Sequence, residues 1–600
     1  MNKKNFLFYL LNSILVYISG QLIFFGLNGS YQKRIKLITE FNSASFKYIF
    51  TGIVLFVLFL SFCILLFWLI KIQPFKQIEP KKIKKGFLIS GWVIFFICFT
   101  LLAAKQWALT RFPIDQPDLV YFTLTNIQGT VDKTIYLEVF TIIFVCLIIT
   151  LILFLPIFFY EKKTGFSNFS ARFAKSINLN LLYFLFSLLI LVASTLDLTK
   201  DLHLAKYAQV IKQYSQPAVE SEFYKNEYII PEYENIIFPQ KKKNVIIIFV
   251  ESMESSFADK NSGGIMNKNL IPNLTKLAQE NINFSNTDKI GGGVDLSGTG
   301  WTIAGMLAKM AGLPYNLLGD EVQDCKDFLP GAITLNDILN KNGYNQLFIF
   351  GSDKHFAGRD ALLETHGNVE IHDIEWYKAQ NLLPKDYQVF WGFEDRKLYD
   401  YARTELDNIS KNEKPFLFGF LTTDTHMPIG YQDEFCPKTE DMPLKNSIVY
   451  ADLLLSSFLD WCKAQSWYDE TVIIIMGDHL FMATSDTNPF DSDDYITSHN
   501  LKSDLEGMGQ NPRRWFNLIL NASPVKTTES YKNRYFSSFD MFPTILSAMG
   551  CEIKGDKLSF GVDLFSGEKT LCERFDENYI NSQIMARNLQ YEQMEFMLEK

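Results

Sequence analysis

The segment Thr471-Val-Ile-Ile-Ile-Met-Gly-Asp-His479 decides the fold expected of this chain. Its apolar run predicts a buried strand of a parallel sheet, because strands covered on both faces carry continuous rather than alternating apolar residues. The strand ends in Gly477-Asp478-His479, so a carboxylate and an imidazole emerge together at the carboxyl edge of the sheet. Divalent cations bind this pair of oxygen and nitrogen donors. The segment therefore predicts a core strand and part of a metal site.

A second apolar run, Asn244-Val-Ile-Ile-Ile-Phe-Val250, is followed in the same way by Glu251 and Ser252. The carboxyl ends of parallel strands meet at one edge of a sheet, so we expect Glu251 to share a metal site with Asp478 and His479. Glu254 is a neighbouring candidate that lies further into the turn. Taken singly, Gly-Asp-His is often only a turn, and acidic residues after strands commonly cap helices.

The chain around these two runs alternates strand-like and helix-like segments. Strands are predicted at 245–250, 346–350, 416–421, 472–476 and 516–520. Helices are predicted at 271–281, 301–311, 334–342, 395–409, 447–465 and 538–549. This alternation is typical of an α/β domain whose mainly parallel sheet is covered by helices on both faces.

A glycine-rich loop, Gly291 to Gly300, leads into the helix predicted to begin at Trp301. Backbone N–H groups at a helix start can hold an anionic phosphate. A hydroxyl at that position, next to a divalent cation, can lose its proton and attack phosphorus. Thr302 is the preferred nucleophile and Thr299 is the alternative, although such a loop is by itself more often a flexible connector.

Two further strand ends carry polar groups. His426 follows the strand at 416–421, where an imidazole can bind or protonate a leaving alkoxide. Arg359 follows the strand at 346–350 and can grip a phosphate oxygen pair bidentately. Alone, His426 could be a packed loop histidine and Arg359 a surface ion pair. The convergence of four strand ends favours a functional interpretation.

The first third of the chain is apolar enough to predict an α-helical transmembrane bundle of five spans. The spans are placed at 5–27, 47–70, 86–104, 137–160 and 178–196. The loops at 71–85 and 161–175 are richest in Lys and Arg, which places them in the cytoplasm. An odd number of spans then puts the rest of the chain outside the cytoplasm, so the short fifth span decides the compartment. The bundle serves either as a simple anchor or also to present a lipid.

We therefore expect three parts. Residues 1–196 form the transmembrane domain, 197–243 a juxtamembrane helix and linker, and 244–600 an extracytoplasmic catalytic domain. The net charge of −9 gives no reason to expect nucleic-acid binding, because no basic stripe stands out in the second half. The eight cysteines form no CxxC pair; a disulfide between Cys551 and Cys572 and free thiols throughout are both open.

Together these motifs resemble the phosphoglycerol transferase and lipoteichoic acid synthase family of the alkaline phosphatase and sulfatase superfamily. The similarity runs from about Asn244 to Gly550. The motifs are Phe-Val-Glu251-Ser, Ile271-Pro-Asn-Leu, Gly298-Thr-Gly-Trp-Thr302-Ile-Ala-Gly-Met, Phe-Ala-Gly-Arg359-Asp, Thr-His426-Met-Pro, Gly-Asp478-His479 and Phe539-Asp-Met-Phe-Pro-Thr-Ile-Leu546. The stretch from Trp301 to Met306 is closest to the branch that decorates periplasmic glucans.

The resemblance implies an alkaline-phosphatase-like domain and a two-step transfer. Thr302 would attack phosphatidylglycerol, release diacylglycerol and become a phosphoglyceryl-threonine, which a hydroxyl of a glycan or glycolipid then displaces. Glu251, Thr302, Asp478 and His479 would hold one divalent cation, manganese by family habit, with magnesium or zinc as alternatives. Arg359 and His426 would bind the glycerol phosphate. The resemblance further implies a monomeric, multi-pass protein of the inner or plasma membrane with a periplasmic catalytic domain.

The chain also departs from the family pattern. Ala357 stands where lipoteichoic acid synthases carry Trp, and Phe350 where they carry His, which favours single transfer over polyglycerolphosphate synthesis. A phosphoethanolamine transferase acting on lipid A is the nearest competitor, although such enzymes usually have paired cysteines and Gly-Glu-Thr after the first strand. A sulfatase activity is disfavoured because Cys-x-Pro-x-Arg is absent. A different class of function is an inactive membrane scaffold that keeps the fold. Such a scaffold would bind no divalent ion, whereas the retained ligand set favours an enzyme.

Overall fold

The computed structural model describes residues 81–111, 137–151, isolated positions between 191 and 212, and 216–596 without 317–327, 428, 483–488, 491–511 and 529–530. The chain divides into two compact units. The first comprises Met1–Asp115, Val131–Tyr207 and Thr484–Asp486, and the second comprises Gln116–Thr130, Ala208–Ala483 and Thr487–Lys600. The candidate site residues all belong to the second unit.

The described part of the first unit is helical. Helix α4 runs over Lys81–Arg111 and covers the predicted span at 86–104. Residues 137–151 are also helical and cover part of the predicted span at 137–160. The indole Nε1 of Trp107 donates a hydrogen bond to Glu138 Oε2 over 2.8 Å. Where the structure describes the chain, no helix has both the length and the apolar character needed to cross a bilayer.

The remaining predicted spans fall on other residues. Those at 5–27 and 47–70 lie outside the described residues, as does nearly all of 178–196. The five-span bundle therefore stays a prediction.

The second unit is built on a seven-stranded sheet in the order β3-β8-β7-β2-β6-β4-β5. The strands are β2 (Asn244–Val250), β3 (Gly292–Gly293), β4 (Asn345–Phe350), β5 (Glu370–His372), β6 (Phe416–Leu421), β7 (Thr471–Gly477) and β8 (Trp515–Leu520). The five strands from β7 to β5 in this order are parallel. β8 pairs antiparallel with β7, and β3 pairs antiparallel with β8. The predicted, mainly parallel α/β sheet is confirmed.

The register of the sheet brings its strand ends to one level. Strand β2 pairs with β7 from Asn244 opposite Thr471 to Val250 opposite Gly477. On its other side β2 pairs with β6. Leu421, the last residue of β6, lies opposite Phe249 of β2 and opposite Phe350 at the end of β4. The residues that follow these four strands therefore start from a common edge.

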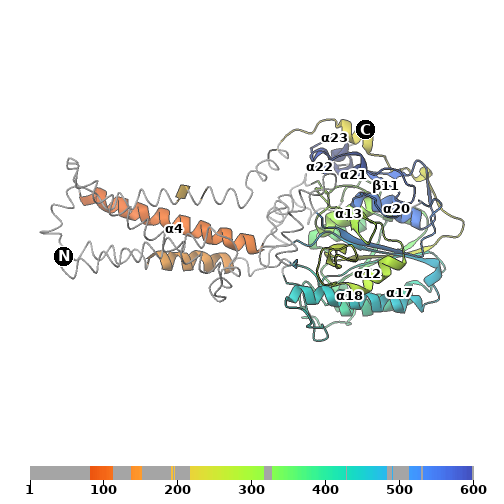
Figure 1. Cartoon of the computed structure of the whole chain (residues 1–600), viewed down its shortest axis with the longest axis horizontal. Coiled ribbons are helices and arrows are strands. Elements are labelled where there is room, and N and C mark those ends of the chain that lie inside the picture. Colours follow the sequence, from red (N-terminus) through yellow and green to blue (C-terminus); the bar gives the residue numbers. More distant parts are fainter. Residues whose placement is uncertain are drawn as a thin grey trace. The chain divides into compact units, whose positions relative to one another are not determined.

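Strand β2 has apolar side chains on both faces, and each face has its own core. Val245, Ile247 and Phe249 pack in one buried cluster with helices α13, α14 and α20. Ile246, Ile248 and Val250 pack in the other with α12, α17 and α18. Figure 1 shows α12, α17 and α18 on one side of the sheet and α13 and α20 on the other. A continuous apolar run is what such a two-sided position requires.

The elements have the following bounds. The covering helices are α12 (Pro272–Glu280), α13 (Thr302–Ala311), α14 (Leu335–Lys341), α17 (Asp395–Ile409), α18 (Pro443–Lys463) and α20 (Met541–Ala548). Smaller helices are α11 (Glu222–Glu227), α15 (Arg359–Thr365), α16 (Ile374–Ala379), α21 (Leu571–Arg574), α22 (Glu577–Ile584) and α23 (Leu589–Phe596). Two small sheets pair β1 (Ile236–Ile237) with β9 (Glu552–Ile553), and β10 (Lys557–Leu558) with β11 (Gly561–Val562).

The segment before β2 packs on the end of the chain. In β1, Ile236 pairs with Ile553, and the ring of Phe223 in α11 lies 5.8 Å from that of Phe560. Part of the stretch expected to be a linker thus contributes to the core of the second unit.

Candidate metal centre

Glu251, Asp478 and His479 form a buried group at the carboxyl edge of the sheet. Each offers one ligand atom, and these atoms lie within 4.8 Å of one another. His479 Nε2 is 3.4 Å from Asp478 Oδ2 and 3.8 Å from Glu251 Oε1. The arrangement follows from the paired register of β2 and β7, because Glu251 and Asp478 are the next residues after a matched pair.

The donor atoms of this group suit a divalent cation. Asp478 Oδ1 accepts hydrogen bonds from the backbone N–H groups of Ser252 (2.7 Å) and His479 (2.9 Å). Its other oxygen, Oδ2, is buried and has no hydrogen-bond partner among the described residues. His479 Nδ1 lies 2.8 Å from the carbonyl oxygen of Leu480, which can only accept, so Nδ1 carries the proton and Nε2 offers its lone pair. Nε2 is likewise buried without a partner in this part of the structure.

The electrostatics of the group also favour a bound cation. Burial raises the pKa of Glu251 well above its usual range, and the nearby charge of Asp478 raises it further. The Ser252 hydroxyl, which donates to Glu251 Oε1 over 2.6 Å, opposes this rise in pKa only in part. Ser252 has φ of 52°, a left-handed backbone conformation that is rare outside glycine and common at functional sites. Without a cation, the Glu251 carboxylate therefore favours a proton.

Thr302 is the first residue of α13 and is partly exposed. Its Oγ1 lies 3.5 Å from Glu251 Oε2, so the structure brings together all four residues expected to hold the metal. Thr299, the alternative nucleophile, is fully buried. Its hydroxyl donates to the carbonyl oxygen of Leu296 and accepts from the Leu296 N–H, which ties it into the loop. The geometry favours Thr302.

Helix α13 presents one face to the Gly-Asp-His turn. A Cβ atom on Gly305 would lie 2.0 Å from the carbonyl oxygen of Asp478, so only glycine allows this approach. Two turns along from Thr302, the fully buried Lys309 donates to the same carbonyl oxygen over 2.7 Å and to Ser538 Oγ over 2.9 Å. Burial lowers the pKa of Lys309 to about 8. This lysine was not predicted as a site residue, because its only signal in the sequence is a charge within an apolar helix.

Glu254 does not join the group. Its carboxylate forms a buried ion pair with Arg513 and accepts a hydrogen bond from the backbone N–H of Phe481 over 2.9 Å. Glu254 is therefore a structural residue that links the start of β8 to the turn after β2, and its candidacy as a metal ligand was wrong.

Arg359 begins α15 and is buried. Its guanidinium donates from Nη2 to Ser352 Oγ over 2.9 Å and from Nε to the carbonyl oxygen of Phe356 over 3.1 Å. Burial lowers the pKa of Arg359 to about 10, and the charges of Asp353 and Glu251 oppose that shift. The side chain remains a cation near the carboxylate edge.

His426 is partly exposed at the same edge. Its Nδ1 lies 2.8 Å from the carbonyl oxygen of Met427, which assigns the proton to Nδ1 and the lone pair to Nε2. Desolvation lowers the pKa of His426 to about 4, and the positive charge of Arg359 acts in the same direction. The imidazole is therefore neutral at pH 7.

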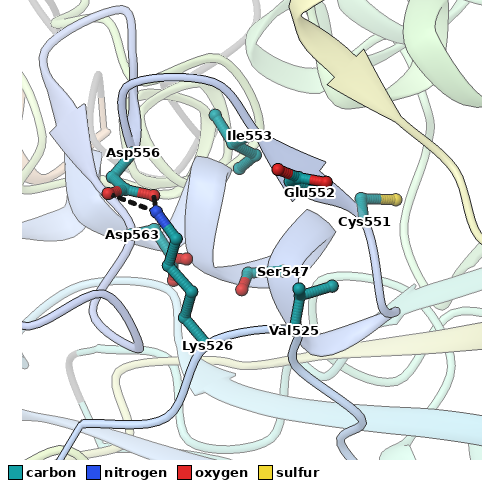
Figure 2. A pocket seen from close by; sticks show the side chains of 8 residues that line it. All are labelled: Val525, Lys526, Ser547, Cys551, Glu552, Ile553, Asp556 and Asp563. Carbon is teal, nitrogen blue, oxygen red and sulfur yellow. Dashed lines mark hydrogen bonds and ion pairs between the residues drawn. The ribbon is translucent and has the colours of Figure 1, made fainter.

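A small polar pocket elsewhere in the unit contains none of these residues (Figure 2). It is lined by Val525, Lys526, Ser547, Cys551, Glu552, Ile553, Asp556 and Asp563. Lys526 Nζ donates to both Asp556 carboxylate oxygens, over 2.6 and 2.8 Å, so these charges are paired. Cys551 is a free, buried thiol, as is Cys572, so the disulfide left open by the sequence is not formed.

A protein-family model described as Sulfatase matches residues 243–551. Phosphoglycerol transferase I of Xanthomonas axonopodis pv. citri (strain 306) is 33% identical over 264 residues, which are 42% of this chain and 36% of that protein. Phosphoglycerol transferase I of Salmonella paratyphi B (strain ATCC BAA-1250 / SPB7) is 32% identical over 252 residues, 41% of this chain and 32% of that protein. The match thus spans about a third of each curated relative.

Among solved structures, the lipoteichoic acid synthase LtaP from Listeria monocytogenes aligns with a TM-score of 0.43 at 20% identity. The alignment covers 60% of this chain and 81% of that chain.

Proposed function

Because this chain belongs to the sulfatase family, we propose that it is a metal-dependent membrane transferase that moves glycerol phosphate from phosphatidylglycerol to a glycan. The relatives named phosphoglycerol transferase I support the transferred group. One observation supports the chemistry: a threonine hydroxyl at a helix start lies beside a buried carboxylate–imidazole group that fits a divalent cation. We place the catalytic domain outside the cytoplasm, on the basis of the five predicted spans.

We assign the metal-holding role to Glu251, Thr302, Asp478 and His479. A bound divalent cation, manganese in the first instance, supplies positive charge that lowers the pKa of a nearby hydroxyl and offsets charge on a phosphate. The Thr302 hydroxyl then serves as the nucleophile, and its position at the start of α13 lets backbone N–H groups face the phosphate.

Arg359 and His426 complete the donor site in this proposal. The Arg359 guanidinium holds a phosphate oxygen of phosphatidylglycerol. His426 Nε2 takes up the proton that the Thr302 hydroxyl gives up and passes it to the leaving diacylglycerol oxygen, and its low pKa favours that second transfer. The products of this step are diacylglycerol and phosphoglyceryl-Thr302. A hydroxyl of the acceptor glycan then attacks phosphorus and displaces Thr302.

The test uses the full-length protein in detergent with manganese and phosphatidylglycerol labelled in its glycerol head group. We expect diacylglycerol release and a labelled phosphoglycerol adduct on the peptide that contains Thr302, found by mass spectrometry. An adduct on another residue would refute the assigned nucleophile. Labelled phosphatidylethanolamine is run in parallel, and preferential cleavage of that lipid would replace glycerol phosphate by phosphoethanolamine as the transferred group.

A further inference from the structure

Trp391 lies next to one of the two side chains assigned to the donor phosphate and is linked to the other through Phe356. Its ring centroid is 4.7 Å from that of His426 and 5.3 Å from that of Phe356. Phe356 in turn contacts Arg359, whose guanidinium carbon lies 5.5 Å from the centre of the Phe356 ring. The indole therefore borders the candidate site although it comes from the loop between α16 and α17.

The backbone around Trp391 is held firmly against the end of β4. The N–H of Phe393 donates to the carbonyl oxygen of Gly351 over 2.9 Å, and Gly392 forms an isolated bridge with Ser352. A Cβ atom on Gly392 would lie 1.8 Å from the Gly351 carbonyl oxygen, so this approach needs glycine. Ser352 is also the residue whose hydroxyl accepts from Arg359. The backbone next to Trp391 is thus fixed relative to the end of β4.

The rings around Trp391 form a partly exposed aromatic surface. Phe356, Phe390, Trp391 and Tyr431 are all half-buried, and Phe390 stacks on Tyr431 at 5.9 Å with an interplanar angle of 20°. Exposed polar side chains, among them His355 and Gln388, adjoin these aromatics in the chain. Ring faces bordered by polar groups suit a sugar, which offers C–H bonds on its faces and hydroxyls at its edge.

We propose that Trp391 is the platform on which a sugar ring of the acceptor glycan stacks, with one hydroxyl presented to His426 Nε2. This inference rests on the proposed function and extends it to the second half-reaction. The acceptor O–H bond breaks as its oxygen bonds to phosphorus, and the P–O bond to Thr302 breaks. The proton passes to His426 and on to Thr302, so no proton is gained or lost overall.

The experiment separates the two half-reactions of the full-length protein. Diacylglycerol release from phosphatidylglycerol is measured without acceptor, and phosphoglycerol transfer is measured with gluco-, galacto- and aminosugar oligosaccharides or with glycerol. In the Trp391→Ala variant we expect the ratio of sugar transfer to diacylglycerol release to fall about tenfold. Transfer to glycerol, which has no ring to stack, keeps its ratio to diacylglycerol release. Trp391→Phe retains an aromatic ring, so its ratio of sugar transfer to diacylglycerol release should lie between those of the wild type and Trp391→Ala.

Phe435→Ala is the matched control, because Phe435 is 61% exposed on a neighbouring loop and packs under Arg396 at 4.7 Å. Its transfer ratio stays at the wild-type value. An unchanged ratio in Trp391→Ala, or an equal loss with sugar and glycerol, would overturn the sugar platform. The sugar platform would also be overturned if none of these sugars increased the rate of phosphoglycerol transfer by the wild-type protein. A fall in diacylglycerol release alone in Trp391→Ala would overturn it as well and would assign Trp391 to the lipid. Absence of any diacylglycerol release from the wild type would instead overturn the proposed function.

Discussion

The ammonium group of Lys309 donates a hydrogen bond to the backbone carbonyl oxygen of Asp478 over 2.7 Å. The bond links the helix that carries Thr302 to the turn that carries two of the candidate metal ligands. In Lys309→Met, the Asp478 carbonyl loses this buried donor, at a cost of about 1–3 kcal/mol. We expect manganese affinity, measured by titration calorimetry, to fall about tenfold or more.

A lysine on the surface provides the control for this variant. Lys276 is exposed and forms a long ion pair of 3.9 Å with Glu280, so Lys276→Met should leave manganese affinity unchanged. Equal manganese affinity in Lys309→Met and wild type would show that the hydrogen bond does not position Asp478.

Gly305→Ala should disrupt the same contact from the helix side. Alanine has the higher helix propensity, so the substitution would stabilise an exposed helix by about 1 kcal/mol. Here the added Cβ would overlap the Asp478 carbonyl oxygen, at 2.0 Å. We expect reduced manganese affinity and slower diacylglycerol release. Ala308→Gly in the same helix is the control, and a larger loss of manganese affinity in that variant would contradict the close-approach argument.

Thr302→Ala should abolish diacylglycerol release while the protein stays folded and inserted. The variant lacks the hydroxyl that lies 3.5 Å from Glu251 and so cannot form the phosphoglyceryl adduct. Thr302→Ser keeps the hydroxyl and should keep measurable release. Thermal unfolding serves as the check on folding, and normal turnover in Thr302→Ala would rule out this nucleophile.

Asp478→Ala and His479→Ala should each empty the metal site, because each removes a buried donor atom that lacks another partner among the described residues. Metal content of the purified proteins is measured by elemental analysis. Glu254→Gln is the control and should retain the wild-type metal content, since Glu254 is paired with Arg513. A full equivalent of manganese in either ligand variant would contradict the assignment.

Manganese binding should depend on pH through Glu251. The raised pKa means that the metal-free protein holds a proton on this group at pH values where an ordinary glutamate is ionised. The cation must displace that proton, so affinity should fall as pH drops below the raised pKa. Proton release in calorimetry with buffers of different ionisation enthalpy measures the effect. The proton release should be smaller in Glu251→Gln. Manganese binding that does not depend on pH in the wild type would contradict this role of Glu251.

The same shift sets the pH dependence of stability without metal. The folded state binds the Glu251 proton more tightly than the unfolded state does. The contribution of this proton to the free energy of unfolding is therefore present at low pH and is lost as pH rises through the raised pKa. In the metal-free state, wild type should therefore lose free energy of unfolding relative to Glu251→Gln as pH rises. Saturating manganese should reverse this trend.

The sequence was informative wherever structure and chemistry are local. The apolar runs before Glu251 and Asp478 predicted β2 and β7, and their common edge predicted the three-residue group, because parallel strands align their ends. Contacts between distant segments could not be predicted in this way. Arg513, which pairs with Glu254, is 259 residues away along the chain. The sequence around Glu254 therefore gave no sign that the charge of this carboxylate is neutralised.

Lys309 and Trp391 illustrate two other limits of the sequence. A lysine among apolar residues does not reveal which carbonyl oxygen it will meet, since that depends on how α13 packs against the turn after β7. The indole borders the site only because the loop at Gly392 docks on the end of β4. Both depend on tertiary packing, which a local pattern does not contain.

The pairing of β2 with β7 has a consequence for how this protein tolerates insertions and deletions. Removing one residue within β7 would shift Asp478 into a position whose side chain points to the opposite face of the sheet. Changes in the length of connections remote from the strand ends would leave that alignment untouched. Indel scanning should therefore find the two strands intolerant of any change in length, while distant surface connections accept several added residues.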